Sequence, residues 1–203
     1  MNSILHWGGR FGNNIQQISN AIFYCKENGL SFRCPPNDLI NQFEVKFGEE
    51  YCRPKIFFFH INSELGNGYS DFDVDVDKLT KERRSICVNI IYNFLKIDFS
   101  KIKALEDDTI VLHIRSGDIF SRKNYQCNVV SSYLQNPLSF YLDIIKDYKK
   151  VIVITEDFNN PVIKELDKLK NVEVKILTTT ESIEIILSSK NLVTSGVSSF
   201  AIA

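Results

Sequence analysis

The sequence lacks an excess of charge of either sign, because 24 lysines and arginines stand against 25 aspartates and glutamates, a net charge of −1. Proteins that bind duplex nucleic acid cluster lysine and arginine, so this balance gives no indication of a nucleic-acid partner. A small phosphate-bearing ligand stays compatible with it, since one arginine near a helix N-terminus can hold such a group. The 203 residues are 44% apolar, which is typical of a packed globular protein and excludes a disordered one.

Cysteines and long apolar runs are also scarce. Five cysteines stand singly, without CxxC spacing: Cys25, Cys34, Cys52, Cys87 and Cys127. This pattern disfavours a zinc ribbon or a thioredoxin-like site, and the odd count argues against a secreted disulfide framework. No segment approaches ~20 apolar residues, and the start has no basic region followed by an apolar stretch. We therefore expect a cytoplasmic protein with neither a membrane span nor a signal peptide.

The second half of the chain alternates between short apolar runs and helical patterns. Four runs are predicted to be strands, at residues 110–114, 151–155, 172–177 and 191–194. Asn136-Pro137 and Asn160-Pro161 each predict a helix start with asparagine as the cap and proline at the first position, and a third helix is expected over 181–188. Strands that alternate with helices predict an α/β fold with a parallel, doubly wound sheet.

The first half is less regular. A strand is expected over residues 3–7, followed by a glycine-rich loop and a helix with Ile15, Ile18, Ile22 and Cys25 at helical spacing. Asn13 or Asn14 is expected to cap this helix and Gly29 to end it. A core strand at 56–59 and a helix over 78–96 complete this half. The polar stretch from 98 to 108 suggests two domains, 1–104 and 105–203.

Parallel strands end at one edge of a sheet, and ligands bind there. The segments that leave the predicted strands in the second half are polar and rich in hydroxyl groups: 113–118, 155–157, 178–180 and 195–199. Arg115 is the one conspicuous arginine among them. The sequence therefore predicts a pocket for a phosphate-bearing ligand at this edge.

Arg115 has two equally supported interpretations. A guanidinium at a strand end can pair bidentately with a diphosphate and stabilise charge on a departing oxygen. An ion pair with Asp118 explains the same residue without a ligand. Asp118 is also the carboxylate nearest in position to act as a general base, unless it only orients Arg115.

The other polar residues at this edge also have alternatives. Glu156 and Asp157 can accept hydrogen bonds from a ribose or a base, or they are solvated loop charges. The segment 195–200 can cradle an anion, although an ordinary serine-capped helix start is commoner. His113 lies inside an apolar strand, where a core histidine with satisfied hydrogen bonds is the more frequent arrangement.

Two further motifs are weak. The loop 8–13 matches neither the GxGxxG motif nor a P-loop. The missing GxGxxG motif disfavours a dinucleotide oxidoreductase. Arg10 and Asn13 project from the loop into a cleft, or its glycines serve only the strand-to-helix turn. The carboxylates of residues 71–77 have calcium-loop spacing, but Val76 stands where such a loop needs glycine, and the alternation fits a solvent-facing strand better. No metal site is predicted.

Three segments together resemble the fucosyltransferase superfamily, which includes the α-1,2-, α-1,6- and protein O-fucosyltransferases. Gly9-Arg10-Phe11-Gly12-Asn13-Asn14 looks like the N-terminal R-F-G-N loop of that superfamily. His113-Ile114-Arg115-Ser116-Gly117-Asp118 matches its H-x-R-x-G-D motif, and Ser198-Ser199-Phe200 is similar to its S-S-F motif. The α-1,2 enzymes usually carry a second arginine where this chain has Ser116. Members also continue past the S-S-F motif, so we expect the last helix of the second half to be absent or short.

The resemblance implies a GT-B fold of two Rossmann-like halves with parallel sheets, and inverting transfer of fucose from GDP-fucose to a glycan without a metal or other cofactor. Arg115 and Asp118 would be the catalytic residues. The second half would supply most donor contacts: His113, Arg115, Gly117, Glu156, Asp157, Ser198, Ser199 and Phe200. The first half would add Arg10, Gly12 and Asn13. Two alternatives stay open, namely another nucleotide-sugar donor, or a catalytically weak module that binds a nucleotide or a glycan.

Overall fold

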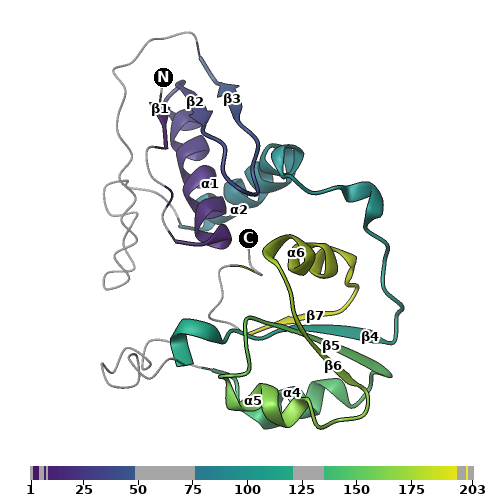
Figure 1. The fold of residues 1–203 in the computed structure, drawn as a ribbon. Helices are drawn as coiled ribbons and strands as arrows, with labels where there is room; N and C mark the ends of the chain where they lie inside the picture. Colours follow the sequence, from purple (N-terminus) through teal and green to yellow (C-terminus); the bar gives the residue numbers. More distant parts are fainter. Residues whose placement is uncertain are drawn as a thin grey trace. The chain divides into compact units, whose positions relative to one another are not determined.

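The computed structural model describes residues 2–4, 7, 9–48, 76–120, 135–195 and 200. The chain separates into two compact units, of which unit 1 ends at Lys96 and unit 2 begins at Ile97 (Figure 1). The polar stretch at 98–108 thus belongs to unit 2, whereas the sequence suggested a division within it, after residue 104.

In its described part, unit 1 combines a small mixed sheet with two α-helices. Its elements are β1 (Asn2–Ser3), α1 (Phe11–Glu27), β2 (Ser31–Cys34), β3 (Phe43–Lys46), α2 (Val76–Asn89) and the 3-10 helix η1 (Ile91–Phe94). The sheet has the order β1-β2-β3, with β1 parallel to β2 and β3 antiparallel to β2. The expected parallel sheet is therefore found only for β1 and β2. A short connection joins β2 directly to β3, and without a crossover helix the chain returns in the opposite direction.

The helix α1 has its predicted apolar side but a different start. Its core side chains are buried as the spacing predicts: Ile15, Ile18, Ile22 and Cys25. The N-cap is Arg10 and not Asn13 or Asn14, because Gly9 turns the chain just before it with φ +68°. Both asparagines consequently lie inside the first turn. The predicted end is confirmed, since Gly29 follows the C-cap residue with φ +61°.

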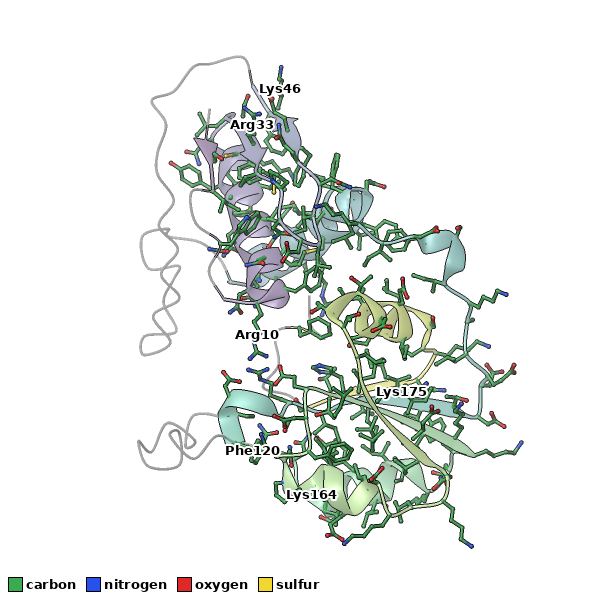
Figure 2. All side chains as sticks on the ribbon, in the orientation of Figure 1. Arg10, Arg33, Lys46, Phe120, Lys164 and Lys175 are labelled. Carbon is green, nitrogen blue, oxygen red and sulfur yellow. The ribbon has the colours of Figure 1, made fainter. Side chains whose placement is uncertain are left out.

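The strands β2 and β3 separate apolar from charged side chains. Phe32 and Phe43 are buried, with their ring centroids 6.2 Å apart. On the opposite face Arg33 is the register partner of Glu44, and both Arg33 and Lys46 are exposed (Figure 2). This alternation is the expected pattern of a sheet with one face on the core.

The expected strand at 56–59 and most of the alternating segment 71–77 lie outside the described residues. The end of that segment is corrected, because Val76 and Asp77 begin α2 instead of continuing a strand. The helix formers lysine, leucine, glutamate and arginine that follow favour this outcome. The helix predicted over 78–96 therefore starts earlier than expected, and its last part is the 3-10 helix η1.

Unit 2 contains the predicted parallel sheet. Its strands are β4 (Thr109–His113), β5 (Lys150–Thr155), β6 (Val172–Ile176) and β7 (Leu192–Thr194), in the order β6-β5-β4-β7 with every pair parallel. Its helices are α4 (Leu138–Ile145), α5 (Pro161–Leu166), α6 (Thr179–Ser188) and the 3-10 helices η2 (Phe99–Lys101) and η3 (Gly117–Phe120). Figure 1 shows α4 and α5 on one face of this sheet and α6 on the other.

Successive residues of β4 belong to opposite faces of the sheet. Ile110 and Leu112 are buried in the cluster that includes Tyr141 of α4 and Ile163 of α5. Val111 belongs instead to the cluster against which Ile185 and Ile186 of α6 pack. The period of two therefore assigns each residue near the end of β4 to one face or the other.

Among the described α-helices of unit 2, two of the three starts follow local capping chemistry. Asn160 caps α5, its Oδ1 accepting a hydrogen bond from Val162 N at 3.0 Å, with proline in the first turn as predicted. A capping box between Thr178 and Glu181 begins α6 slightly earlier than expected. At α4 the predicted cap Asn136 is wrong by one residue, because Pro137 has an extended ψ of 159° and is itself the N-cap.

In the part of the chain that the structure describes, no helix combines the length and the apolar character needed to cross a membrane. The expectation about the last helix concerns residues after Phe200, which lie outside the described ranges.

Candidate functional site

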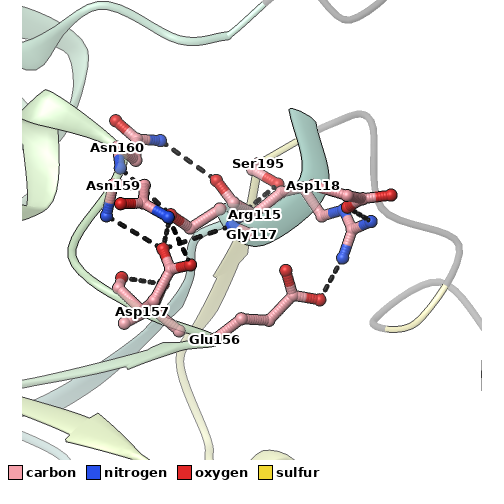
Figure 3. Close-up of polar contacts among 10 residues, drawn as sticks. Arg115, Gly117, Asp118, Glu156, Asp157, Asn159, Asn160 and Ser195 are labelled. Carbon is pink, nitrogen blue, oxygen red and sulfur yellow. Dashed lines mark hydrogen bonds and ion pairs between the residues drawn. The ribbon is translucent and has the colours of Figure 1, made fainter. Parts of the chain in front are cut away.

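Three segments of unit 2 meet at the carboxyl edge of its sheet, where β4, β5 and β7 end (Figure 3). The backbone N–H of Ile114 donates to the carbonyl oxygen of Ile154 at 3.0 Å, and Ser195 N donates to His113 O at 3.0 Å. Arg115 N donates to Ser195 Oγ at 3.2 Å. The loop after β4 is therefore fastened on both sides, toward β5 and toward β7.

The register of β4 and β5 decides which residues face each other in this loop. His113 is the register partner of Ile154. Continuing the pairing by two residues places Arg115 next to Glu156, and by three places Ser116 next to Asp157. Both pairs are observed as side-chain contacts.

The guanidinium of Arg115 lies between two carboxylates. Its Nη1 donates to Glu156 Oε1 and its Nη2 to Asp118 Oδ1. The Arg115 side chain is only 16% exposed, against 33% for Glu156 and 59% for Asp118. The ion pair with Asp118 that the sequence suggested is thus present, and Glu156 is a second partner that only the register reveals.

Ser116 ties the loop to the turn between β5 and α5. Its hydroxyl donates to Asp157 Oδ1 at 2.5 Å and accepts from Asn160 N at 3.0 Å, while its residue is fully buried. Asn160 Nδ2 also donates to the carbonyl oxygen of Arg115 at 3.0 Å. The asparagine that caps α5 therefore also holds the backbone that carries the arginine.

Asp157 is the centre of this network. Besides Ser116, its carboxylate accepts from Gly117 N at 3.3 Å and from both the backbone and the side-chain nitrogen of Asn159, at 2.9 and 2.7 Å. Burial alone would raise the pKa of Asp157, but the hydrogen bonds from Ser116, Asn159 and Gly117 together lower its pKa below the usual value. Partners within the chain thus account for both carboxylate oxygens.

The two faces of the sheet separate the residues of this edge into two groups. Ser116 bonds to Asp157 and to Asn160 at the start of α5, on the face that α5 covers. His113 follows the alternation of Val111 toward the other face, and its ring lies 5.0 Å from that of Phe200, tilted by 32°. The network on the α5 side holds the loop in place, and the charged Arg115 side chain is held against Glu156.

Gly117 has two reasons to be glycine. Its φ of +64° lies in the left-handed region that side chains disfavour. A Cβ at this position would also lie 2.2 Å from Glu156 Oε2. The glycine of the H-x-R-x-G-D motif therefore makes room for the carboxylate that pairs with Arg115.

His113 differs from the satisfied core histidine that the sequence favoured. Its side chain is buried, and its Nδ1 has no hydrogen-bond partner among the residues that the structure describes. Burial, and secondarily the positive charge of Arg115, lowers the pKa of His113 to about 4. The imidazole is therefore neutral near pH 7, with a ring nitrogen that can still accept or donate a hydrogen bond.

The remaining predicted residues fall elsewhere. Arg10, Gly12 and Asn13 lie in unit 1 at the start of α1, where Arg10 is exposed and Gly12 is buried (Figure 2). Asn13 lies over Gly9, since a Cβ on Gly9 would come within 2.1 Å of Asn13 Nδ2. Ser198 and Ser199 lie outside the described residues.

The sequence included Ser116 and Ser195 in the segments expected at this edge but gave neither a partner, and it did not place Asn159 or Asn160 there. Asn160 was recognised only as a helix cap. One signal in the sequence could have indicated its contact with Arg115. Asn160-Pro161 follows the strand β5, and Arg115-Ser116 follows the neighbouring strand β4, so both pairs lie at the same edge of the sheet.

Among the described residues, no group of three or more histidine, cysteine, aspartate or glutamate side chains is arranged to hold a metal ion. Comparisons of the chain with protein-family models, with curated proteins and with solved structures returned no match.

Proposed function

We propose that the carboxyl edge of unit 2 binds the diphosphate of a nucleotide sugar, and that the protein is an inverting glycosyltransferase with GDP-fucose as donor. The supporting observation is Arg115, a guanidinium held at the carboxyl ends of parallel strands by the bonds of its loop to β5, β7 and α5. Ligands of open α/β sheets bind at this edge. The H-x-R-x-G-D resemblance supplies the choice of fucose and of a GT-B arrangement with unit 2 as the donor half.

The proposed reaction needs a fixed positive charge more than any other group. An acceptor hydroxyl attacks the anomeric carbon while the bond from that carbon to the phosphate oxygen breaks, and GDP leaves with an added negative charge. Arg115 stabilises this charge on the leaving oxygen, and its planar guanidinium can make two parallel bonds to phosphate oxygens. The hydroxyl proton passes to a carboxylate, for which Asp118, exposed beside Arg115, is the candidate base.

His113 and Phe200 fit the same proposal. The neutral imidazole of His113 has a buried nitrogen without a partner among the described residues, and a ligand on the Phe200 side of the sheet can bond it. A buried polar atom without a partner is costly, so a ligand oxygen that bonds it contributes to affinity.

A second candidate, a nucleotide-binding module with weak catalysis, is favoured by one observation. Arg115 is already engaged by Glu156 and Asp118, and a guanidinium in that state has fewer donors available for a leaving group.

Titration calorimetry with GDP, UDP, ADP and CDP, together with a transfer assay from GDP-fucose, tests the proposal. We expect GDP to bind best, and Arg115→Ala to reduce transfer at least ~100-fold, as removal of a main stabiliser of transition-state charge does. Arg84→Ala, an exposed arginine on α2, is the matched control and should leave transfer unchanged. Preference for another base would exclude fucose as the donor sugar, and GDP binding without turnover would favour the binding module.

A further inference from the structure

We infer that Asn160 is a positioning residue for Arg115, because its one carboxamide both caps α5 and holds the backbone that carries the guanidinium. The inference rests on the proposed function, in which Arg115 stabilises the charge of the leaving diphosphate. It adds to that function a buried residue that acts through Arg115 without touching the donor.

The backbone of Arg115 is held by side chains from two other segments. Arg115 lies two residues beyond the end of β4 at His113. Its N–H donates to Ser195 Oγ at 3.2 Å, and its carbonyl oxygen accepts from Asn160 Nδ2 at 3.0 Å (Figure 3). The place of the arginine at the sheet edge therefore depends on a serine after β7 and on the asparagine that begins α5.

The carboxamide of Asn160 is fixed in one orientation. The residue is 1% exposed, and its Oδ1 accepts from Val162 N at 3.0 Å. Its own backbone N–H donates to Ser116 Oγ at 3.0 Å. Turning the amide over would set its nitrogen against the N–H of Val162 and its oxygen against the carbonyl oxygen of Arg115, so only the observed orientation satisfies both groups.

Capping α5 does not by itself require asparagine. Serine and aspartate supply a cap oxygen about as well, and threonine caps helices too, as Thr178 does at the start of α6. Asparagine is the cap residue that carries an N–H donor beside that oxygen. The bond to the carbonyl oxygen of Arg115 is thus the use of Asn160 that the cap does not explain.

Loss of this bond should change the loop at Arg115 more than elsewhere. Without Asn160 Nδ2, the peptide group between Arg115 and Ser116 loses its acceptor bond and turns toward another donor, because a buried carbonyl is costly to leave unpaired. The hydroxyl of Ser116 and the N–H of Gly117 stay bonded to Asp157, so the rest of the loop keeps its place. A turned peptide redirects the Arg115 side chain.

Asn160→Ser tests the inference, because it keeps a cap oxygen for α5 and removes the donor to Arg115. Transfer from GDP-fucose and calorimetric titration of GDP are measured on the same samples. We expect kcat to fall about tenfold while the Kd for GDP changes less than about threefold, since a misplacement of about 1 Å lowers a rate by up to ~100-fold. The attraction between the guanidinium and a diphosphate changes less over such a distance.

The stoichiometry of GDP binding distinguishes positioning from a purely structural role. If Asn160 serves only as a cap, any loss of transfer comes from unfolded protein, and the stoichiometry falls in parallel with kcat. That result would overturn the inference. A reduced kcat with the stoichiometry of the wild type supports it.

Thr178→Ser is the matched control, because it exchanges one cap residue for another at the same edge, where the side chain of residue 178 bonds to Glu181. It should leave kcat and GDP binding unchanged. Asn160→Asp, checked for folding by circular dichroism, is the second variant. It keeps the size of the side chain and the cap oxygen but replaces the amide nitrogen, so we expect kcat to fall as in Asn160→Ser.

The guanidinium can also be followed without catalysis. The Nε–H signal of Arg115 in an NMR spectrum of nitrogen-labelled protein is assigned by its loss in Arg115→Lys. We expect this signal to shift in both Asn160 variants and to stay unchanged in Thr178→Ser.

The outcomes separate the inference from the proposed function. A kcat or an Arg115 signal that is unchanged in both Asn160 variants overturns the inference and leaves the proposed function standing. A wild-type protein that neither binds GDP nor transfers fucose overturns the proposed function. The Arg115 signal then decides the inference alone, since a shift in both Asn160 variants supports it and an unmoved signal overturns it.

Discussion

Replacing Gly117 with alanine should destabilise unit 2 through two separable effects. The first is conformational, because φ +64° places the new side chain in the left-handed region, at a cost of roughly 1–2 kcal/mol. The second is steric, because the added Cβ would lie 2.2 Å from Glu156 Oε2 and must push that carboxylate away from Arg115.

The size of the second effect follows from the exposure of the ion pair. With Arg115 16% and Glu156 33% exposed, the pair lies near the surface, and its loss should cost up to about 1 kcal/mol. We therefore expect Gly117→Ala to lower the free energy of unfolding by about 2–3 kcal/mol. Gly29→Ala measures the conformational cost alone, since φ there is +61° and an added Cβ has nothing within 4 Å.

A double-mutant cycle with Glu156→Ala isolates the steric effect. Urea denaturation followed by far-UV circular dichroism gives the free energy of unfolding for the wild type, both single variants and the double variant. Once Glu156 has lost its carboxylate, Gly117→Ala should cost about 1 kcal/mol less than it does in the wild type. Equal costs in the two backgrounds would refute the idea that Gly117 makes room for Glu156.

Two further predictions concern acid stability. The pKa of His113 is about 4 in the folded protein, against 6.5 ordinarily. Between these two pH values the unfolded chain binds a proton that the folded chain does not, so stability falls as pH is lowered. Between about pH 7 and about pH 5 this should lower the free energy of unfolding by about 2 kcal/mol. His113→Leu should make the free energy of unfolding, measured by urea denaturation, less dependent on pH in this range. An equally steep dependence in the variant would contradict the prediction. Asp157 acts in the same sense at lower pH: its pKa is lowered in the folded protein, so the stability it contributes is present above the ordinary pKa of an aspartate and is lost as pH falls through the folded-state pKa. Asp157→Ala should lower the free energy of unfolding by about 2 kcal/mol near pH 7, because Ser116 and Gly117 lose a charged acceptor. An unchanged thermal unfolding temperature would show that the network contributes nothing to stability.

The sequence was sufficient to predict the parts of the fold that depend on local signals. The four strands of unit 2 are short apolar runs, and the start of α5 has an asparagine cap followed by proline, so each carries its own pattern. The start of α1 was missed because the turn at Gly9, and not an asparagine side chain, decides where helical geometry begins. In unit 1 the strands β2 and β3 were not predicted, and the expected parallel sheet was wrong for this pair, since no local pattern distinguishes a parallel from an antiparallel partner.

The site could be predicted only in outline. The carboxyl edge and Arg115 follow from the order of strands, but the partners of Arg115 depend on the register between β4 and β5. The contacts that build the edge join residues 41 positions apart, such as Ser116 with Asp157 and Arg115 with Glu156. A single sequence contains no measure of register, and a shift by one residue would have exchanged these pairs.

The alternation of β4 also limits which changes in chain length this edge tolerates. His113 and Arg115 are spaced by two, the period of an extended chain, while Ser116, next in the sequence, is directed to the α5 side. A one-residue insertion after His113 would exchange the two sides, placing the isoleucine where the arginine now lies and forcing the arginine toward the buried start of α5. Deletion of one residue would have the same effect. Homologues that use this edge in the same way should therefore vary in the residues between β4 and β5 while keeping the spacing from His113 to Gly117 constant.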